Sequence, residues 1–295
     1  MKETLFTGSG VALITPFDKD LKVNYEELER LVEYQIENGT DAIVACGTTS
    51  EASAMSADEH NKVTSFIIDK VNGRIPVIAG TGSNDTAFCL EMSLEAKKAG
   101  ADGLLLVTPY YNKTSQHGLI KHFNYIADNV GLPVILYNIP GRTGMKIMPE
   151  TYLELSKNPY IVGTKEATGD LASTAKTISL CGDNLDVYSG EDNLTLPLMA
   201  IGGKGVISVF ANPLPKIMHE MTAAILAGDY ETGRQYSNKY FELMSGFMMD
   251  VNPVPVKEAM NMMGFNCGEC RMPLVGMTDE NKAKMTALLQ KYSLI

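Results

Sequence analysis

The sequence predicts an α/β fold: a (β/α)8 TIM barrel followed by a small C-terminal helical domain. Short apolar runs alternate with longer amphipathic stretches over most of the chain, and eight such runs precede residue 229. The chain has 295 residues. Because a barrel of this kind typically needs about 250 residues, the length leaves room for an appendage.

The eight apolar runs read as parallel strands that are buried on both faces. Each run is short, contains β-branched residues in part, and shows no alternation of polar and apolar side chains. The runs lie at residues 11–14, 42–46, 76–79, 103–107, 133–137, 161–164, 186–189 and 205–209.

Helix signals follow the first four runs. The stretch 24–37 begins with a capping residue and is closed by a glycine. The stretch 56–71 opens with a capping box, a serine with a glutamate three residues further on. The stretches 85–98 and 115–129 also end shortly before glycines. These strand–helix units indicate a barrel catalytic domain over residues 1–228.

A doubly wound sheet is the structural alternative. It usually carries a glycine-rich fingerprint after its first strand, and the first apolar run is followed by Thr15, Pro16 and Phe17 instead. The barrel is therefore favoured.

Residues 229–295 differ in character and form the predicted C-terminal helical domain. The segment is rich in Met, which fills irregular apolar gaps. Its pattern indicates two or three helices, at residues 230–249, 256–263 and 279–292.

The charge balance is acidic. Lys and Arg number 25 against 35 Asp and Glu, which gives a net charge of −10. Such a field repels nucleic acid and anionic membranes, so neither is expected as a partner. No apolar run is long enough for a membrane span, and no signal peptide is evident, so we expect a cytoplasmic protein.

The five cysteines are scattered, which suits a reducing compartment. Cys267 and Cys270 form a single C-x-x-C. A zinc site usually needs a second pair, and a redox site should open a helix after a strand, so we interpret both as ordinary thiols.

Active sites of (β/α)8 barrels lie at the carboxyl ends of the strands. Polar or flexible residues just beyond the apolar runs are therefore the candidates for chemistry. They are Thr15, Thr48, Thr49, Gly80, Thr81, Gly82, Thr108, Tyr110, Tyr111, Tyr137, Lys165, Glu166, Gly190, Glu191, Ile207 and Ser208.

Lys165 is the most informative of these candidates because it follows the apolar run 161–164. Burial at a barrel mouth disfavours the charged ammonium and lowers its pKa. A neutral amine attacks carbonyl carbons, as in Schiff-base lysines. The alternative is a structural lysine paired with a carboxylate such as Glu166.

Three further sites have both a functional and a structural interpretation. The Tyr137 phenol can transfer protons, or can simply be a core aromatic. Thr48 and Thr49 can bind a carboxylate through hydroxyls and backbone N–H groups, or can form a helix-capping turn. Arg142, after a Pro-Gly pair, can clamp a carboxylate, or can lie on the surface.

Metal and phosphate sites are not expected. The four histidines show no metal-ligand spacing. The glycine-rich segment at residues 202–205 lacks the spacing of a P-loop and the Ser or Thr after its lysine.

Three segments together resemble those of the dihydrodipicolinate synthase family, within the pyruvate-dependent class I aldolases related to N-acetylneuraminate lyase. They are residues 47–51 (GTTSE), 137–142 (YNIPGR) and 163–166 (GTKE), and the likeness covers essentially the whole chain. The resemblance implies a lyase of diaminopimelate and lysine biosynthesis. It would condense pyruvate with L-aspartate 4-semialdehyde to 4-hydroxy-tetrahydrodipicolinate.

The resemblance implies catalytic roles for four residues. Lys165 would form the Schiff base with pyruvate, so no cofactor is needed. Tyr137, Thr49 and Tyr111 would form a proton relay. Tyr111 would reach across a subunit interface, and the implied assembly is a homotetramer built as a dimer of dimers.

Substrate-binding roles follow from the same resemblance. Thr48 and Thr49 would hold the pyruvate carboxylate, and Gly190 and the backbone of Ile207 would line the pyruvate pocket. Arg142 would hold the carboxylate of the semialdehyde.

Two other functions stay open at this stage. A sibling Schiff-base aldolase, such as N-acetylneuraminate lyase or a keto-sugar-acid aldolase, would share Lys165 and Tyr137 but generally lack the counterpart of Arg142. A non-catalytic binding barrel would have lost the lysine or the relay, and both are present.

The family's lysine-inhibited members carry His and Glu where this chain has Ala57 and Phe88. His60, Asn84 and Tyr110 match the other residues of the pocket in which those members bind the inhibitor lysine. A cationic ligand without its carboxylate partner should bind poorly. We therefore expect weak feedback by lysine or none.

Overall fold

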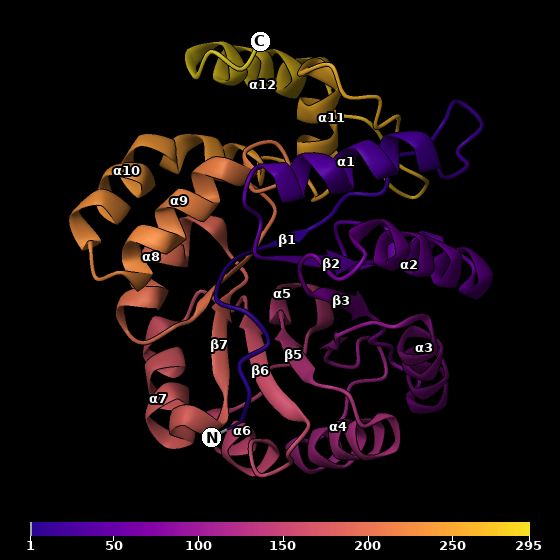
Figure 1. Ribbon diagram of the computed structural model, residues 1–295, viewed down its shortest axis with the longest axis vertical. Helices are drawn as coiled ribbons and strands as arrows, with labels where there is room; N and C mark the ends of the chain where they lie inside the picture. Colours follow the sequence, from indigo (N-terminus) through magenta and orange to yellow (C-terminus); the bar gives the residue numbers. More distant parts are fainter. Residues whose placement is uncertain (1) are drawn as a thin grey trace.

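The computed structural model describes residues 2–295 and contains a closed barrel of eight parallel strands (Figure 1). The strands pair in chain order, and the last one pairs with the first. They are β1 (Gly8–Ala12), β2 (Ala42–Ala45), β3 (Val77–Gly80), β4 (Gly103–Val107), β5 (Val134–Asn138), β6 (Ile161–Glu166), β7 (Asp186–Ser189) and β8 (Gly205–Ser208). The predicted fold class is confirmed.

Helices surround the barrel, and all four predicted barrel helices are present. Asn24 and Ser56 cap their helices through side-chain oxygens that accept from backbone N–H groups. The helices up to the eighth strand and just beyond it are α1 (Tyr25–Glu37), α2 (Ala57–Val71), α3 (Thr86–Ala99), α4 (Gln116–Val130), α5 (Pro140–Thr143), α6 (Pro149–Leu155), α7 (Leu171–Cys181), α8 (Thr195–Ala200) and α9 (Pro215–Leu226). Within residues 2–295, no helix is long and apolar enough to cross a membrane.

The first strand begins and ends earlier than predicted. It covers Gly8–Ala12 rather than residues 11–14. The prediction misses the start of the strand because the residues Gly8, Ser9 and Gly10 are not apolar. Small residues are needed there: a Cβ on Gly205 of β8 would lie 2.0 Å from the Gly8 carbonyl oxygen. Close approach of β1 and β8 therefore hides this strand from a search for apolar runs.

The barrel interior is filled by a cluster of buried apolar side chains. Phe6 stacks on Tyr188 with ring centroids 4.4 Å apart, and the Tyr188 hydroxyl donates to the Phe6 carbonyl at 2.7 Å. Ile78, Ile135 and Ile207 belong to the same buried cluster. The interior is thus a filled core, and any site must lie at an end of the barrel.

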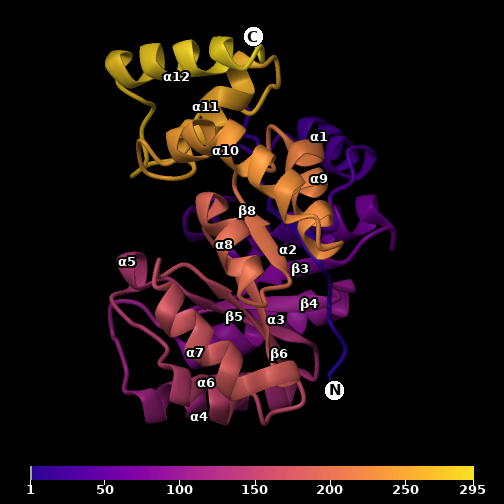
Figure 2. The ribbon, with the colours of Figure 1, turned by 90° about the vertical axis from the view of Figure 1, so that its left-hand side faces the viewer.

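The three predicted C-terminal helices are present as α10 (Tyr230–Gly246), α11 (Val254–Met262) and α12 (Asp279–Lys291), and they lie at the same end of the molecule (Figure 2). Leu243 and Phe247 belong to the apolar cluster that contains Val11 and Leu13 of the barrel. The appendage therefore shares a core with the barrel, and a domain boundary after residue 228 stays a prediction.

A buried ion pair joins α11 to the segment that follows β2. Lys257 Nζ lies 2.9 Å from Glu51 Oε1, and both side chains are only 2% exposed. The same ammonium donates to the Glu269 carbonyl at 3.0 Å and lies 4.0 Å from the ring centroid of Phe17. The Arg271 backbone N–H donates to Glu51 at 2.7 Å. Both charges are thus satisfied inside the protein.

Replacement of Lys257 by methionine should be strongly destabilising because it leaves the Glu51 carboxylate buried without its partner. We expect Lys257→Met to lower the free energy of unfolding by about 3–5 kcal/mol in urea titrations. The control is Lys284→Met, which removes an exposed pair with Glu280 and should cost about 1 kcal/mol or less. Equal losses in the two variants would contradict the importance of the buried pair.

Candidate active site

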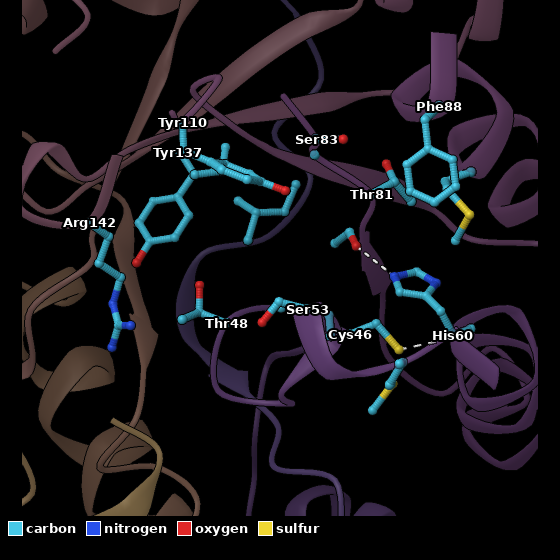
Figure 3. Close-up of a pocket in the computed structure, with 18 of the residues that line it drawn as sticks. Cys46, Thr48, Ser53, His60, Thr81, Ser83, Phe88, Tyr110, Tyr137 and Arg142 are labelled. Carbon is cyan, nitrogen blue, oxygen red and sulfur yellow. Dashed lines mark hydrogen bonds between the residues drawn. The ribbon is translucent and has the colours of Figure 1, made fainter. Parts of the chain in front are cut away.

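A cavity of about 420 Å³ opens beside the carboxyl ends of β2, β3, β4 and β5 (Figure 3). Figure 3 shows Thr48, Tyr137 and Arg142 at one end of this cavity and His60 and Phe88 at the other. The strand-end candidates Thr48, Tyr137 and Arg142 are therefore brought together, as the position of active sites in (β/α)8 barrels requires.

Lys165 lies next to Tyr137 because the strands that carry them are neighbours in register. The Cα atoms of Tyr137 in β5 and Lys165 in β6 are paired. The Lys165 ammonium lies 4.5 Å from the centroid of the Tyr137 ring, and Lys165 is 4% exposed. The amine is therefore held inside the protein against an aromatic face.

The structural alternative for Lys165, an ion pair with Glu166, does not form. Successive strand residues point to opposite faces of the sheet. The Glu166 carboxylate accepts from Asn138 at 3.1 Å and from the Tyr152 hydroxyl at 3.4 Å. Burial raises the pKa of Glu166 to about 6.

Burial lowers the pKa of Lys165 from 10.5 to about 8. The Asp192 carboxylate acts against burial and raises this pKa, while Arg142 lowers it further. Asp192 is itself buried and accepts from the Ser208 hydroxyl at 2.5 Å and from the backbone N–H groups of Val209 and Phe210. On the order of a tenth of the amines are then neutral at pH 7.

Asp192 is absent from the sequence-based candidates although it lies only two residues beyond Gly190. The strand-end rule would reach it if the search extended a few residues further, into the short 3₁₀ helix η3 (Asp192–Leu194). The sequence shows only an aspartate shortly after the seventh strand; its burial near Lys165 is seen in the structure.

Tyr137 is buried, and burial raises the pKa of its phenol to about 12. The Arg142 charge and the nearby Thr48 side chain both lower this pKa, whereas Glu191 raises it. Figure 3 shows Tyr137 and Thr48 at the same end of the cavity. Thr48 lines the cavity together with Tyr137, whereas Thr49 is not among the residues that line it.

Thr49 is buried at 3% exposure, and its hydroxyl accepts from Asn252 Nδ2 at 3.0 Å. The backbone carbonyl of Asn252 accepts from Arg142 Nη2 at 2.9 Å. Asn252 lies in the segment between α10 and α11, many residues after the last strand in the sequence, so its position in the chain does not indicate a place at the site. The predicted arginine is exposed and lines the cavity.

Gly190 lies beside Lys165, and the predicted role of Gly190 and Ile207 in lining a pyruvate pocket stays a prediction. A Cβ on Gly190 would lie 3.2 Å from Lys165 Cε and 2.8 Å from Ala167 Cβ. A side chain at this position would therefore push against the lysine. Ile207 of β8 is fully buried in the cluster that fills the barrel.

Tyr111 does not enter the cavity of its own chain. It is 92% exposed and has a left-handed backbone with φ of 66°. A left-handed conformation is uncommon for a bulky residue and marks a backbone constrained by its surroundings. The single chain therefore leaves Tyr111 apart from the other predicted relay residues.

The other end of the cavity is largely apolar. His60 lies there with Ala57, Phe88 and Tyr110. His60 Nε2 lies 2.9 Å from the Gly80 carbonyl, and burial lowers the pKa of the imidazole, so the ring is neutral at pH 7. Asn84 does not line this part of the cavity; its backbone carbonyl accepts from Asn112.

A closed parallel barrel with a buried lysine, a buried tyrosine and hydroxyl groups at its strand ends defines an enzyme of the (β/α)8-barrel class.

Comparison with known proteins gives the particular family. The sequence matches the model of the dihydrodipicolinate synthetase family over residues 5–292. It is 52% identical to the 4-hydroxy-tetrahydrodipicolinate synthase of Geobacter sulfurreducens, over 99% of this chain and 100% of that protein. The chain belongs to the dihydrodipicolinate synthetase family and is a lyase, and the resemblance seen in its sequence is confirmed.

Solved structures agree with this assignment. The chloride-inhibited dihydrodipicolinate synthase from Acinetobacter baumannii, complexed with pyruvate, is 43% identical with a TM-score of 0.97, over 99% of this chain and 100% of that one. The enzyme from Cyanidioschyzon merolae with lysine bound is 35% identical with a TM-score of 0.96, over 99% and 100%.

Titration of the lysine amines should test the buried environment of Lys165. With 13C-labelled lysine, we expect an NMR resonance that is lost in Lys165→Met to titrate with a midpoint of about 8. Lys2, whose pKa burial also lowers to about 8, is identified in the same way by Lys2→Met. A midpoint for Lys165 at the ordinary value of 10.5 would show that its amine is hydrated.

Proposed function

We propose that the chain condenses pyruvate with L-aspartate 4-semialdehyde to give 4-hydroxy-tetrahydrodipicolinate through a Schiff base on Lys165. This step would belong to diaminopimelate and lysine biosynthesis. One observation carries the proposal: the Lys165 amine is buried beside the Tyr137 phenol, with a pKa lowered to about 8. The pyruvate complex of the Acinetobacter baumannii relative supports pyruvate as the first substrate.

The proposed chemistry follows from a neutral amine in a dry site. The Lys165 nitrogen attacks the ketone carbon of pyruvate, and loss of water leaves a protonated imine. This imine withdraws electrons, so the pyruvate methyl group loses a proton and an enamine forms. The enamine carbon attacks the aldehyde carbon of the second substrate. The substrate's own amine then replaces Lys165 at the imine carbon, which closes the ring and frees the enzyme.

Proton transfer would fall to Tyr137 and the hydroxyls near it. A phenol with a pKa of about 12 is protonated at neutral pH and can donate to the oxygen that leaves as water. Thr48 lines the same cavity as Tyr137, which favours Thr48 as a further member of the relay beside Thr49. Thr49 would also hold the pyruvate carboxylate. Gly190 and Ile207 would leave room for the small keto acid beside the lysine.

Arg142 would hold the carboxylate of the semialdehyde. Its guanidinium lines the cavity and is fixed by the Asn252 carbonyl at 2.9 Å, so its remaining N–H groups are free to bind a carboxylate. This arginine favours the synthase over a sibling aldolase that acts on sugar acids. The positive charge also supplies the local attraction that an acidic protein needs for two substrates that each carry a carboxylate.

We further propose that Tyr111 completes the relay of a neighbouring subunit in a homotetramer. Its 92% exposure and its left-handed backbone support this proposal, because a large aromatic side chain held away from its own chain is suited to an interface.

We propose the cytoplasm as the location of the protein, because its five free cysteines suit a reducing compartment.

Steady-state kinetics with both substrates tests the proposed reaction. Lys165→Ala should lose more than about a thousandfold in kcat, since no nucleophile remains. Tyr137→Phe should lose about 10²–10⁴-fold. Arg142→Ala should raise KM for the semialdehyde about 10–100-fold, as loss of a charged hydrogen-bonding group does.

Arg234→Ala is the matched control for the arginine, because Arg234 is exposed on α10 and pairs only with Glu231. It should leave both KM values unchanged. Release of pyruvate from N-acetylneuraminate, with no turnover of the semialdehyde, would contradict the proposed reaction and show that the chain is a sibling lyase.

Feedback inhibition by lysine should be weak. The residues that line the cavity include no Asp or Glu, and Arg142 is the charged group among them. The ammonium group of a bound lysine would therefore lose its hydration without gaining an oppositely charged partner in the cavity. Millimolar lysine should leave most of the activity in place, whereas Phe88→Glu should make the enzyme more sensitive to lysine. Strong inhibition of the unmodified protein by lysine would contradict this expectation.

A further inference from the structure

Asn252 makes two hydrogen bonds that join two segments of the active site. Its side-chain Nδ2 donates to Thr49 Oγ1 at 3.0 Å, and its backbone carbonyl accepts from Arg142 Nη2 at 2.9 Å. Thr49 belongs to the segment after β2, while Arg142 belongs to α5. Asn252 itself comes from the segment between α10 and α11, outside the barrel strands.

The direction of the bond between Asn252 and Thr49 matters for what Thr49 can do. When Nδ2 donates, Thr49 Oγ1 is the acceptor, so its own hydrogen is free to point elsewhere. The opposite amide orientation would place both Nδ2 hydrogens where Oδ1 now lies, which is buried and has no partner among residues 2–295. Two orphaned donors cost more than one orphaned acceptor, so the observed orientation is favoured.

The rest of the Thr49 segment is held independently of Asn252. The Ser50 hydroxyl donates to the Leu13 carbonyl at 2.5 Å, and the Glu51 carboxylate is fixed by Lys257. Cys46 and Glu51, at the two ends of the segment, have left-handed backbones with φ of 53° and 61°. Such conformations persist only where the surroundings impose them, so the backbone of this segment is fixed.

We propose that Asn252 is a positioning residue that turns the Thr49 hydroxyl into a hydrogen-bond donor for the carboxylate of pyruvate. This inference rests on the proposed function. Because the segment is fixed by other contacts, loss of the Asn252 amide frees the hydroxyl without moving Thr49. The backbone contact with Arg142 does not depend on the Asn252 side chain, so binding of the second substrate is left intact.

The test measures pyruvate binding and second-substrate kinetics separately. Pyruvate affinity is taken from the concentration that gives half-maximal trapping by borohydride, and KM for the semialdehyde comes from turnover. Asn252→Ala should raise the half-maximal pyruvate concentration about tenfold, as loss of one hydrogen bond to a charged group does. KM for the semialdehyde should change by less than about twofold, since the bond to Arg142 is made by the backbone.

Asn252→Asp separates positioning from simple packing. The aspartate has the same shape, but its carboxylate would accept the Thr49 hydrogen and repel the pyruvate carboxylate. It should therefore weaken pyruvate binding more than Asn252→Ala does. A residue that only fills space would give the reverse order, and that order would overturn the proposal.

A double-mutant cycle with Thr49→Val shows whether Asn252 acts through the hydroxyl. In the Thr49→Val background, Asn252→Ala should have almost no further effect on pyruvate trapping. A full additional loss, or an equal rise in KM for the semialdehyde, would overturn the proposal. Asn261→Ala is the matched control, because Asn261 bonds only the backbone of Gly268 and Cys267, and it should leave both quantities unchanged.

The outcomes also separate this inference from the proposed function. If the unmodified protein traps no pyruvate, the proposed function fails before any variant is compared. If it traps pyruvate and Asn252→Ala traps it equally well, only the role of Asn252 fails. Melting temperatures of each variant show whether a loss reflects unfolding.

Discussion

The arrangement of the site depends on one constraint, a lysine amine held inside a closed barrel. Closure fixes the register of β5 and β6, which places the Lys165 ammonium 4.5 Å from the centre of the Tyr137 ring. Burial there works against the positive charge, and the buried carboxylate of Asp192 partly restores it. A pKa of about 8 results, so a fraction of the amine is neutral, and therefore nucleophilic, near neutral pH.

The C-terminal helices contribute to the site as well as to the fold. Lys257 of α11 neutralises Glu51, and Asn252 before that helix contacts Thr49 and Arg142. The contacts with Glu51 and Thr49 fall on the five-residue segment after β2, and the contact with Arg142 falls on α5. One apolar cluster contains residues of the barrel and of α10, so packing holds the C-terminal helices against the barrel. The appendage therefore acts as a support for the barrel mouth.

Much of this could be predicted from the sequence because it rests on local patterns. Buried parallel strands show as apolar runs, and Lys165, Tyr137 and Thr48 are expected at the site because they follow such runs. The strand Gly8–Ala12 was misplaced because close approach demands small residues there instead of apolar ones. Asn252 could not be predicted because its contacts with Thr49 and Arg142 span 203 and 110 residues of chain, and only the folded structure brings these residues together. The choice between Thr48 and Thr49 likewise depends on side-chain directions that adjacent positions do not reveal.

The most direct test of the central claim is mass spectrometry after borohydride treatment in the presence of pyruvate. The account predicts one irreversible reduced pyruvyl group per chain, located on Lys165 by peptide mapping and absent from Lys165→Ala. Lys284→Ala, which changes an exposed lysine, should trap pyruvate as the unmodified protein does. An unmodified protein that forms no adduct, or forms it on another lysine, would contradict the account and leave Lys165 with a structural role.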